Sequence, residues 1–278
     1  AAEAARSAAE TAAAAAQAVG NGVITAPGDL VVGDADGLAS RLPVGAEGHI
    51  LKIIEGLPSY SPATAATLSI FTATGTWTRP PGCKSIFVLL VGPGGGGGGA
   101  TGASGQISVG AGGGAGEFAW GYFESGFAES EPVTVGAGGA GGAPASTPNS
   151  GSDGSGPTSF GALLSAGPGA GGGRLVTATA VAVVDGGEGG TGGTGGNGRS
   201  VGAQGERATR LSGSVGNAGR GALSPFGGGG KAYSSGTENG GVGGKGAGGG
   251  GAIVVNTTAQ RAGGPGGDGV VLVWEFYS

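Results

Sequence analysis

The sequence predicts a mainly β and irregular fold that ends in a domain of packed polyglycine II helices with a few β-strands. First, 74 of the 278 residues are Gly, against an average of about 7%. Second, the residues that mark disordered chains are sparse, because charged residues make up only 11%. Third, glycine recurs every three residues, which matches the three residues per turn of a polyproline II-type helix. Aromatic residues are 5% of the chain, so we expect a small hydrophobic core and stabilisation by backbone hydrogen bonds.

Residues 1–20 are predicted to form a coiled-coil helix at the end of a fibre shaft. Alanine is the strongest helix former, and one face repeats at heptad spacing, which favours a parallel homo-oligomer. A lone alanine-rich helix is the alternative, but such a helix is marginal in water at under 20 residues. The chain contains no Met, and we expect Ala1 to be an internal cut with more fibre upstream. The seam residues are Ala1, Ala5, Ala8, Ala12, Ala15 and Val19.

Residues 21–68 are predicted to form a small β-rich collar followed by a linker. Short strand candidates lie at 23–25, 29–32, 38–42 and 49–54. The stretch 58–69 contains Pro58 and Pro62 and is assigned to a linker, with a domain boundary near Leu68. His49 has no acidic or cysteine neighbour in the sequence, so we expect a structural role for it.

Residues 69–278 are predicted to form the glycine-rich domain. Strands at 70–72, 76–78 and 85–91 can bury Trp77 and Phe87, and Cys83 is expected to be a buried thiol. The run 186–198 repeats Gly-Gly-X, which would leave two edges of each helix bare so that neighbouring backbones can approach. Flexible linkers are the alternative, but the runs keep returning to apolar segments. The edge residues of this run are Glu188, Thr191, Thr194 and Asn197.

Several function classes are not supported. The formal charge is −5 with no basic cluster, which argues against a nucleic-acid partner. No apolar run approaches the roughly 20 residues of a membrane helix. Gly-x-Gly-x-x-Gly matches lack the strand and helix that cradle a phosphate. With one His and one Cys, no catalytic triad, metal site or cofactor site can be assembled, and Glu129 with Glu131 is better explained as a solvated face than as a glycosidase pair. We therefore expect no enzyme.

Residues 70–278 resemble the glycine-rich C-terminal domains of bacteriophage tail fibres. The residues that carry the resemblance are 71–81 (FTATGTWTRPP), 85–99 (SIFVLLVGPGGGGGG), 113–117, 133–142 (VTVGAGGAGG), 158–161 and 269–276 (GVVLVWEF), with a tail-fibre-like segment at 28–51. The resemblance implies a polyglycine II sandwich whose connecting loops contact a host receptor. The fused helix and collar depart from the distal adhesins of T-even phages and imply a homotrimer attached to other phage tail proteins.

The expected function is therefore that of an extracellular virion protein at the distal end of the tail fibre, which binds a host cell-surface protein or polysaccharide. A structural fibre segment whose adhesin is a separate protein is the alternative, and a polysaccharide-degrading tailspike is a third hypothesis. Binding candidates lie between the glycine runs, at 144–157, 199–226, 231–239 and 253–261. Aromatic residues and Arg dominate binding hot spots, so the candidate receptor-binding residues are Arg207, Arg210, Arg220, Phe226, Tyr233 and Asn256.

Overall fold

The computed structural model describes residue 3 and residues 5–11, 25–47, 49–62, 66–145 and 149–277. The chain divides into two compact units, residues 1–65 and residues 66–278. Most of the regular structure is β-strand, and the described helix is short.

The coiled coil predicted for residues 1–20 is not confirmed. The described part of this segment is one short helix over residues 5–11 in which every residue is exposed. Arg6 Nε lies 2.9 Å from Glu10 Oε1 one turn later, a pair that supports an isolated helix. The high helix propensity of Ala explains this helix without a partner, and the seam positions Ala5 and Ala8 lie exposed. Residues 12–20 of the predicted coil are outside the described residues.

Two hairpins make up the rest of the first unit. Strand β1 (Leu30–Gly33) pairs with β2 (Ala39–Leu42), and β3 (His49–Ile54) pairs with β4 (Leu57–Pro62), both antiparallel. Strand β4 occupies part of the predicted linker: its prolines are tolerated because each strand of a two-stranded hairpin is an edge strand. The carboxylate of Asp29 closes the first hairpin, since it accepts hydrogen bonds from Arg41 Nε at 2.7 Å and from the backbone N–H of Thr25, Ala26 and Val44.

Two facing antiparallel sheets form one end of the second unit, and we call this end the base. One sheet has the order β16-β10-β7-β22-β5 and the other the order β13-β12-β11-β6. Between them lies the main core, in which Trp77, Ile86, Leu90 and Phe160 are almost fully buried. The strands are β5 (Thr67–Phe71), β6 (Gly75–Thr78), β7 (Ser85–Val91), β10 (Phe118–Phe123), β11 (Ser130–Thr134), β12 (Thr158–Phe160), β13 (Leu164–Ala166), β16 (Gly198–Ser200) and β22 (Val270–Phe276).

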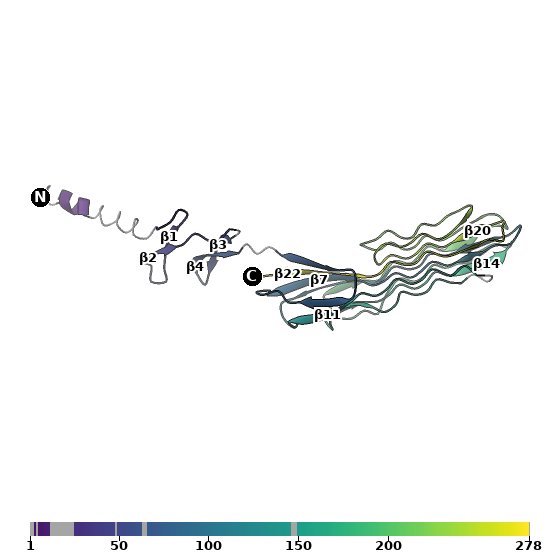
Figure 1. Cartoon of the computed structure of the whole chain (residues 1–278), viewed down its shortest axis with the longest axis horizontal. Coiled ribbons are helices and arrows are strands. Elements are labelled where there is room, and N and C mark those ends of the chain that lie inside the picture. The colour runs from purple at the N-terminus through teal and green to yellow at the C-terminus, as the bar shows by residue number, and fades with distance from the viewer. Residues whose placement is uncertain are drawn as a thin grey trace. The chain divides into compact units, whose positions relative to one another are not determined.

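Shorter strands form the opposite end of this unit. Figure 1 shows β7, β11 and β22 at one end, β14 and β20 at the other, and long extended segments running between them. Two small cores lie at this far end, one around Ile107, Val109 and Ile253 and one around Val254. The strands are β8 (Ala100–Thr101), β9 (Ile107–Gly110), β14 (Arg174–Ala178), β15 (Ala182–Val184), β17 (Ala208–Arg210), β18 (Gly216–Asn217), β19 (Thr237–Glu238), β20 (Ile253–Val255) and β21 (Gln260–Arg261).

The extended segments bond to one another with a period of three residues. In the run 92–99, the N–H groups of residues 92, 95 and 98 donate to the run 110–117, those of 94 and 97 to the run 262–269, and those of 96 and 99 to the run 149–156. The carbonyls of the same run accept from three further runs, 136–143, 166–173 and 246–252. Each run is thus bonded to neighbours in several directions, whereas a β-strand bonds in only two.

Three runs lie at the centre of this bundle. Residues 92–99, 110–117 and 246–252 are all buried, bond to one another, and are each bonded to six neighbouring runs. Nine outer runs surround them in a ring. In ring order these are residues 136–143, 149–156, 166–173, 185–196, 201–207, 217–223, 227–233, 239–245 and 262–269.

Glycine is required at most positions of the inner runs because there is no room for a Cβ atom. The positions that do carry a side chain are Pro93, Ala111, Ala115, Glu117, Ala247 and Ala252. A Cβ atom on Gly97 would overlap the carbonyl of Gly250, and a Cβ on Gly113 would overlap the carbonyl of Gly95. The edge predicted for the run 186–198 is confirmed as exposed, with Glu188, Thr191, Thr194 and Asn197 all facing outward. In the described part of the chain, no helix is long and apolar enough to cross a membrane.

Candidate functional site

The loops at the far end of the bundle form the best candidate for a recognition surface, and we call them the tip loops. Successive runs alternate in direction between the base and the far end, so alternate connections all emerge at the same place. The first and last strands of this unit, β5 and β22, lie in the base, at the end opposite these loops. The tip loops among the described residues are 102–106, 179–181, 211–215, 234–236 and 256–259.

Hydrogen bonds join neighbouring tip loops into one surface. The side-chain oxygen of Asn256 accepts from the N–H of Gly105 at 2.6 Å, and the N–H of Asn256 donates to the carbonyl of Gln106 at 2.9 Å. Asn256 adopts a left-handed conformation with φ of 50°, which Asn tolerates better than most residues. A Cβ on Gly213 would lie 2.8 Å from the carbonyl oxygen of Gly105 and 3.1 Å from Thr179 Cγ2. Three loops therefore meet at Gly105.

The tip loops carry no charged residue and consist of small, hydroxyl, amide and aliphatic side chains. Their largest apolar side chains are Val181, Leu211 and Val215, which are 70%, 52% and 52% exposed. The register of β15, β17 and β18 places Val181 opposite Leu211, and Leu211 opposite Val215. Directly opposed residues of antiparallel strands share one face of the sheet. The three form an exposed aliphatic row.

Two of the predicted binding residues support this end of the bundle from beneath. Arg210 is 5% exposed and donates from Nε to the carbonyl of Ala180 and from Nη1 to the carbonyl of Val176, both at 2.5 Å. It therefore fixes the loop that carries Val181. Tyr233 packs against the small core below the tip, and Lys231 Nζ lies 4.8 Å from the centre of its ring.

The remaining predicted residues lie elsewhere. Asn256 is in a tip loop, whereas Arg207 is exposed on the outer ring, 3.6 Å from Asp185. Phe226 belongs to a connection at the base end of its runs, where its ring lies 6.5 Å from that of Phe118 in β10. Arg220 lies on the side of the bundle. The six candidates therefore do not converge on one site.

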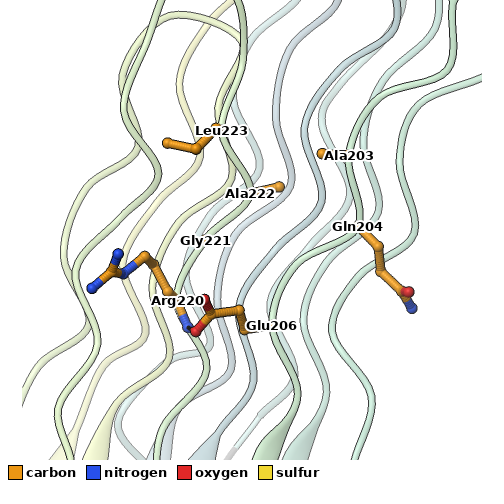
Figure 2. A pocket seen from close by; sticks show the side chains of 7 residues that line it. All are labelled: Ala203, Gln204, Glu206, Arg220, Gly221, Ala222 and Leu223. Carbon is orange, nitrogen blue, oxygen red and sulfur yellow. Dashed lines mark hydrogen bonds between the residues drawn. The ribbon is translucent and has the colours of Figure 1, made fainter.

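An open pocket of about 230 Å³ lies on the side of the bundle, between the outer runs 201–207 and 217–223. Figure 2 shows Glu206 and Arg220 close together at one end, while Ala203 and Leu223 stand apart at the other. The backbone N–H of Glu206 donates to the carbonyl of Arg220 at 2.9 Å, and Glu206 Oε2 accepts from the N–H of Arg220 at 3.2 Å. The lining residues are Ala203, Gln204, Glu206, Arg220, Gly221, Ala222 and Leu223.

The buried polar groups of the base serve the fold. Glu275 is 1% exposed and accepts hydrogen bonds from Thr67, Ser69 and Trp77. Cys83 is 1% exposed, so the burial expected from the sequence is confirmed. Burial raises the pKa of its thiol, which favours the protonated form. Among the described residues, no three His, Cys, Asp or Glu side chains are grouped to hold a metal ion.

The tip loops 102–106 and 179–181 are not among the segments predicted to bind, because they are short and lie outside the glycine-poor segments. The alternating direction of the runs identifies these loops. Each run crosses the bundle once, so every second connection along the chain lies at the same end. The same alternation assigns the connection with Phe226 to the base.

Comparison with curated proteins finds no match. The family described as "Glycine-rich domain" matches residues 70–274, a range that includes both sheets of the base, all the glycine runs and all the tip loops. The chain therefore belongs to this glycine-rich domain family.

Proposed function

We propose that this chain is the distal, receptor-binding protein of a bacteriophage tail fibre and that the tip loops contact the host cell surface. The observation that carries the proposal is the convergence of the tip loops at one end of a close-packed bundle, opposite the base. Binding residues are commonly found on loops that a rigid scaffold positions. The resemblance of residues 70–278 to tail-fibre domains supplies the biological setting.

We also propose that the glycine runs are polyglycine II helices. The three-residue period of their hydrogen bonds matches three residues per turn. The six bonded neighbours of each inner run fit hexagonal packing of such helices. The bare glycine backbone permits close approach, and Cα–H···O contacts add to the stability.

The amino-acid composition of the tip loops limits the kinds of receptor that they can bind. Loops without charged residues offer no partner for phosphate groups or clustered carboxylates, which are recognised chiefly by Arg and Lys. The aliphatic row of Val181, Leu211 and Val215 fits an apolar patch on the receptor, and the surrounding Ser, Thr and Asn side chains fit neutral hydrogen-bonding groups. We propose a host surface protein or neutral polysaccharide as the partner, with no enzymatic step and no cofactor. A homotrimeric shaft joined to other tail proteins completes the proposal.

A cell-binding experiment with charged substitutions tests this proposal. The double variant Leu211→Asp/Val215→Asp should reduce binding of the purified chain to host cells by at least about tenfold, because desolvating a charge opposes an apolar contact. The matched control is Val242→Asp, whose side chain is 69% exposed on the run 239–245, away from the tip. The control should bind like the wild type, and all three proteins should show similar thermal unfolding.

Equal binding by the tip variant and the wild type would reject the tip loops as the contact surface. No binding by any correctly folded form would favour a structural fibre segment that carries a separate adhesin.

A further inference from the structure

Two pairs of adjacent outer runs are joined by a single backbone hydrogen bond among the described residues: the runs 166–173 and 185–196, and the runs 201–207 and 217–223. We call the second of these junctions the seam. Each of the other seven adjacent pairs is joined by at least two such bonds, such as those from Gly202 to Gly190 and from Gly205 to Gly187. Across the seam the described residues form one such bond, from Glu206 to Arg220.

The period of three identifies the bond that is missing. Thr209 pairs with Asn217 in β17 and β18, and Glu206 donates to Arg220 three residues further along both runs. The next step joins the N–H of Ala203 to the carbonyl of Leu223, but this bond does not form among the described residues. The pocket lies at that step, with Ala203 on one wall and Leu223 on the other (Figure 2).

Among the described residues, the Ala203 N–H and the Leu223 carbonyl have no backbone partner, so the pocket offers a backbone donor on one wall and a backbone acceptor on the other. A secondary amide matches this arrangement, since its carbonyl can accept from the Ala203 N–H and its own N–H can donate to the Leu223 carbonyl. The floor is formed by Gly221 and Ala222, and the Leu223 side chain is 65% exposed at the rim. These surfaces suit a methyl group attached to the amide.

The surroundings favour an amide that is attached to a sugar. Glu206 and Arg220 close the pocket at one end and can exchange hydrogen bonds with hydroxyl groups. The Gln204 side chain is turned to the neighbouring run, where Nε2 donates to Glu188 Oε1 at 2.9 Å, so it leaves the opening clear. An added peptide strand would need a succession of free backbone groups, whereas only one step is open here.

We propose that the seam pocket binds the acetamido group of an N-acetylated amino sugar. The amide carbonyl accepts from the Ala203 N–H, the amide N–H donates to the Leu223 carbonyl, and the methyl group contacts Ala222 and Leu223. This site is separate from the tip loops, so it does not depend on the tip being the receptor-binding surface.

The first test is an NMR titration of the ¹⁵N-labelled intact chain with N-acetylglucosamine, and with glucose as the matched sugar that lacks the acetamido group. The amide resonances of Ala203, Ala222 and Leu223 should shift with N-acetylglucosamine and not with glucose. Hydrogen exchange of the Ala203 amide should slow when N-acetylglucosamine is present. Equal shifts with both sugars, or no shift at Ala203, would overturn the proposal.

The second test removes the donor while keeping the backbone path. Ala203→Pro deletes the N–H of Ala203, and the φ of proline is close to that of a polyglycine II residue. This variant should bind N-acetylglucosamine about tenfold more weakly, which corresponds to the loss of one hydrogen bond. Val201→Pro is the control, because Val201 is exposed on the same run and does not line the pocket; it should bind normally.

Further measurements distinguish a lost hydrogen bond from a disrupted bundle, and a sugar ligand from a peptide ligand. Unchanged amide resonances of Gly205 and Gly230 in Ala203→Pro would show that the bundle is intact, and exchange protection of Ala203 in the wild type provides a readout that needs no variant. Tighter binding of an acetyl-Gly-Gly-Gly-amide peptide than of N-acetylglucosamine would overturn the sugar in favour of a peptide strand. Normal host-cell binding by Ala203→Pro together with lost sugar binding would leave the tip proposal unaffected.

Discussion

Single buried carboxylates hold separate segments of the chain together, which glycine cannot do because it has no side chain. Asp29 holds the first hairpin, and Glu117, at 2% exposure, accepts from the N–H of Gly167 and Gly193 and from Arg199 Nη1 at 3.0 Å. Glycine runs have no side chains to specify their ends, so buried carboxylates that accept several bonds determine where runs and strands meet.

The first hairpin should lose stability in acid. The Arg41 guanidinium, assisted by backbone N–H groups, holds the pKa of Asp29 well below its usual range. The unfolded value is about 3.9, so the stabilisation is fully present above that pH and is lost as the pH falls towards the folded pKa. Amide exchange of β1 and β2, corrected for intrinsic rates, should show this loss below about pH 4.

The variant Asp29→Asn should abolish most of this pH dependence, whereas Asp36→Asn, at an exposed turn position, should keep it. The same acid profile in the wild type and in Asp29→Asn would contradict the role of Asp29.

The buried carboxylate of Glu275 should contribute more to the free energy of unfolding than an exposed carboxylate does. Glu275→Gln replaces an acceptor of three hydrogen bonds by an amide whose NH₂ group faces the hydroxyl and indole donors. We expect the free energy of unfolding to fall by about 2–3 kcal/mol. Glu129→Gln is the matched control, since this side chain is 84% exposed and 3.4 Å from Arg79, and it should change stability by less than about 0.5 kcal/mol. Chemical denaturation of both variants measures the difference.

Among the elements, single glycine positions differ in how they tolerate a side chain, and most outer-run glycines are packed as closely as inner-run ones. Gly113 lies in an inner run, where a Cβ would overlap the Gly95 carbonyl, and its N–H donates to Gly249 at 2.8 Å. Gly228 lies in an outer run with nothing within 4 Å of its Cβ position. Period alone does not distinguish these two environments, because both runs are glycine-rich.

Alanine scanning separates the two classes. Gly113→Ala should destabilise the domain by about 3 kcal/mol or more, because two backbones must move apart. Gly228→Ala should leave stability unchanged or raise it by about 0.5 kcal/mol, through the lower entropy of the unfolded chain. Thermal unfolding of the two single variants tests the assignment, and equal destabilisation would be inconsistent with the packing described here.

The sequence predicted the strands and glycine runs better than it predicted where residues far apart in the chain lie in space. The strands at 76–78 and 85–91 and the exposed edge from Glu188 to Asn197 follow from local patterns, and they are confirmed. The strand predicted at 70–72 is shifted, because β5 covers Thr67–Phe71 and begins inside the stretch assigned to a linker. The base core around Trp77 is likewise local, because it depends on apolar alternation. The coiled coil predicted for residues 1–20 is not confirmed, since alanine favours a helix whether or not a partner exists.

At the scale of the whole domain, stability resides in backbone hydrogen bonds that only the complete bundle satisfies. Inner-run amides such as those of Gly98, Gly113 and Gly249 should exchange with solvent only on global unfolding. Outer-run amides such as those of Gly205 and Gly244 should exchange faster, through local opening. Residue-resolved hydrogen exchange measures both sets, and equal protection of the two sets would argue against a distinct centre.

The candidate site could not be located from the sequence because it depends on the order in which runs pack. Arg220, Phe226 and Asn256 are similar as loop residues in the sequence, yet they lie on the side, at the base end and at the tip. The seam is also invisible in the sequence: the segments 201–207 and 217–223 resemble other runs, and the structure distinguishes them by the pocket at the step where Ala203 and Leu223 are not bonded.

The alternating direction of the runs also bears on how such a domain can change over generations. Because alternate connections lie at opposite ends, a substitution or an insertion within one tip loop changes the tip while leaving the base untouched. Such a change keeps the register of the runs, since neighbouring runs bond through backbone atoms. Diversity at the tip and constancy of the framework are therefore separately heritable traits of the same polypeptide.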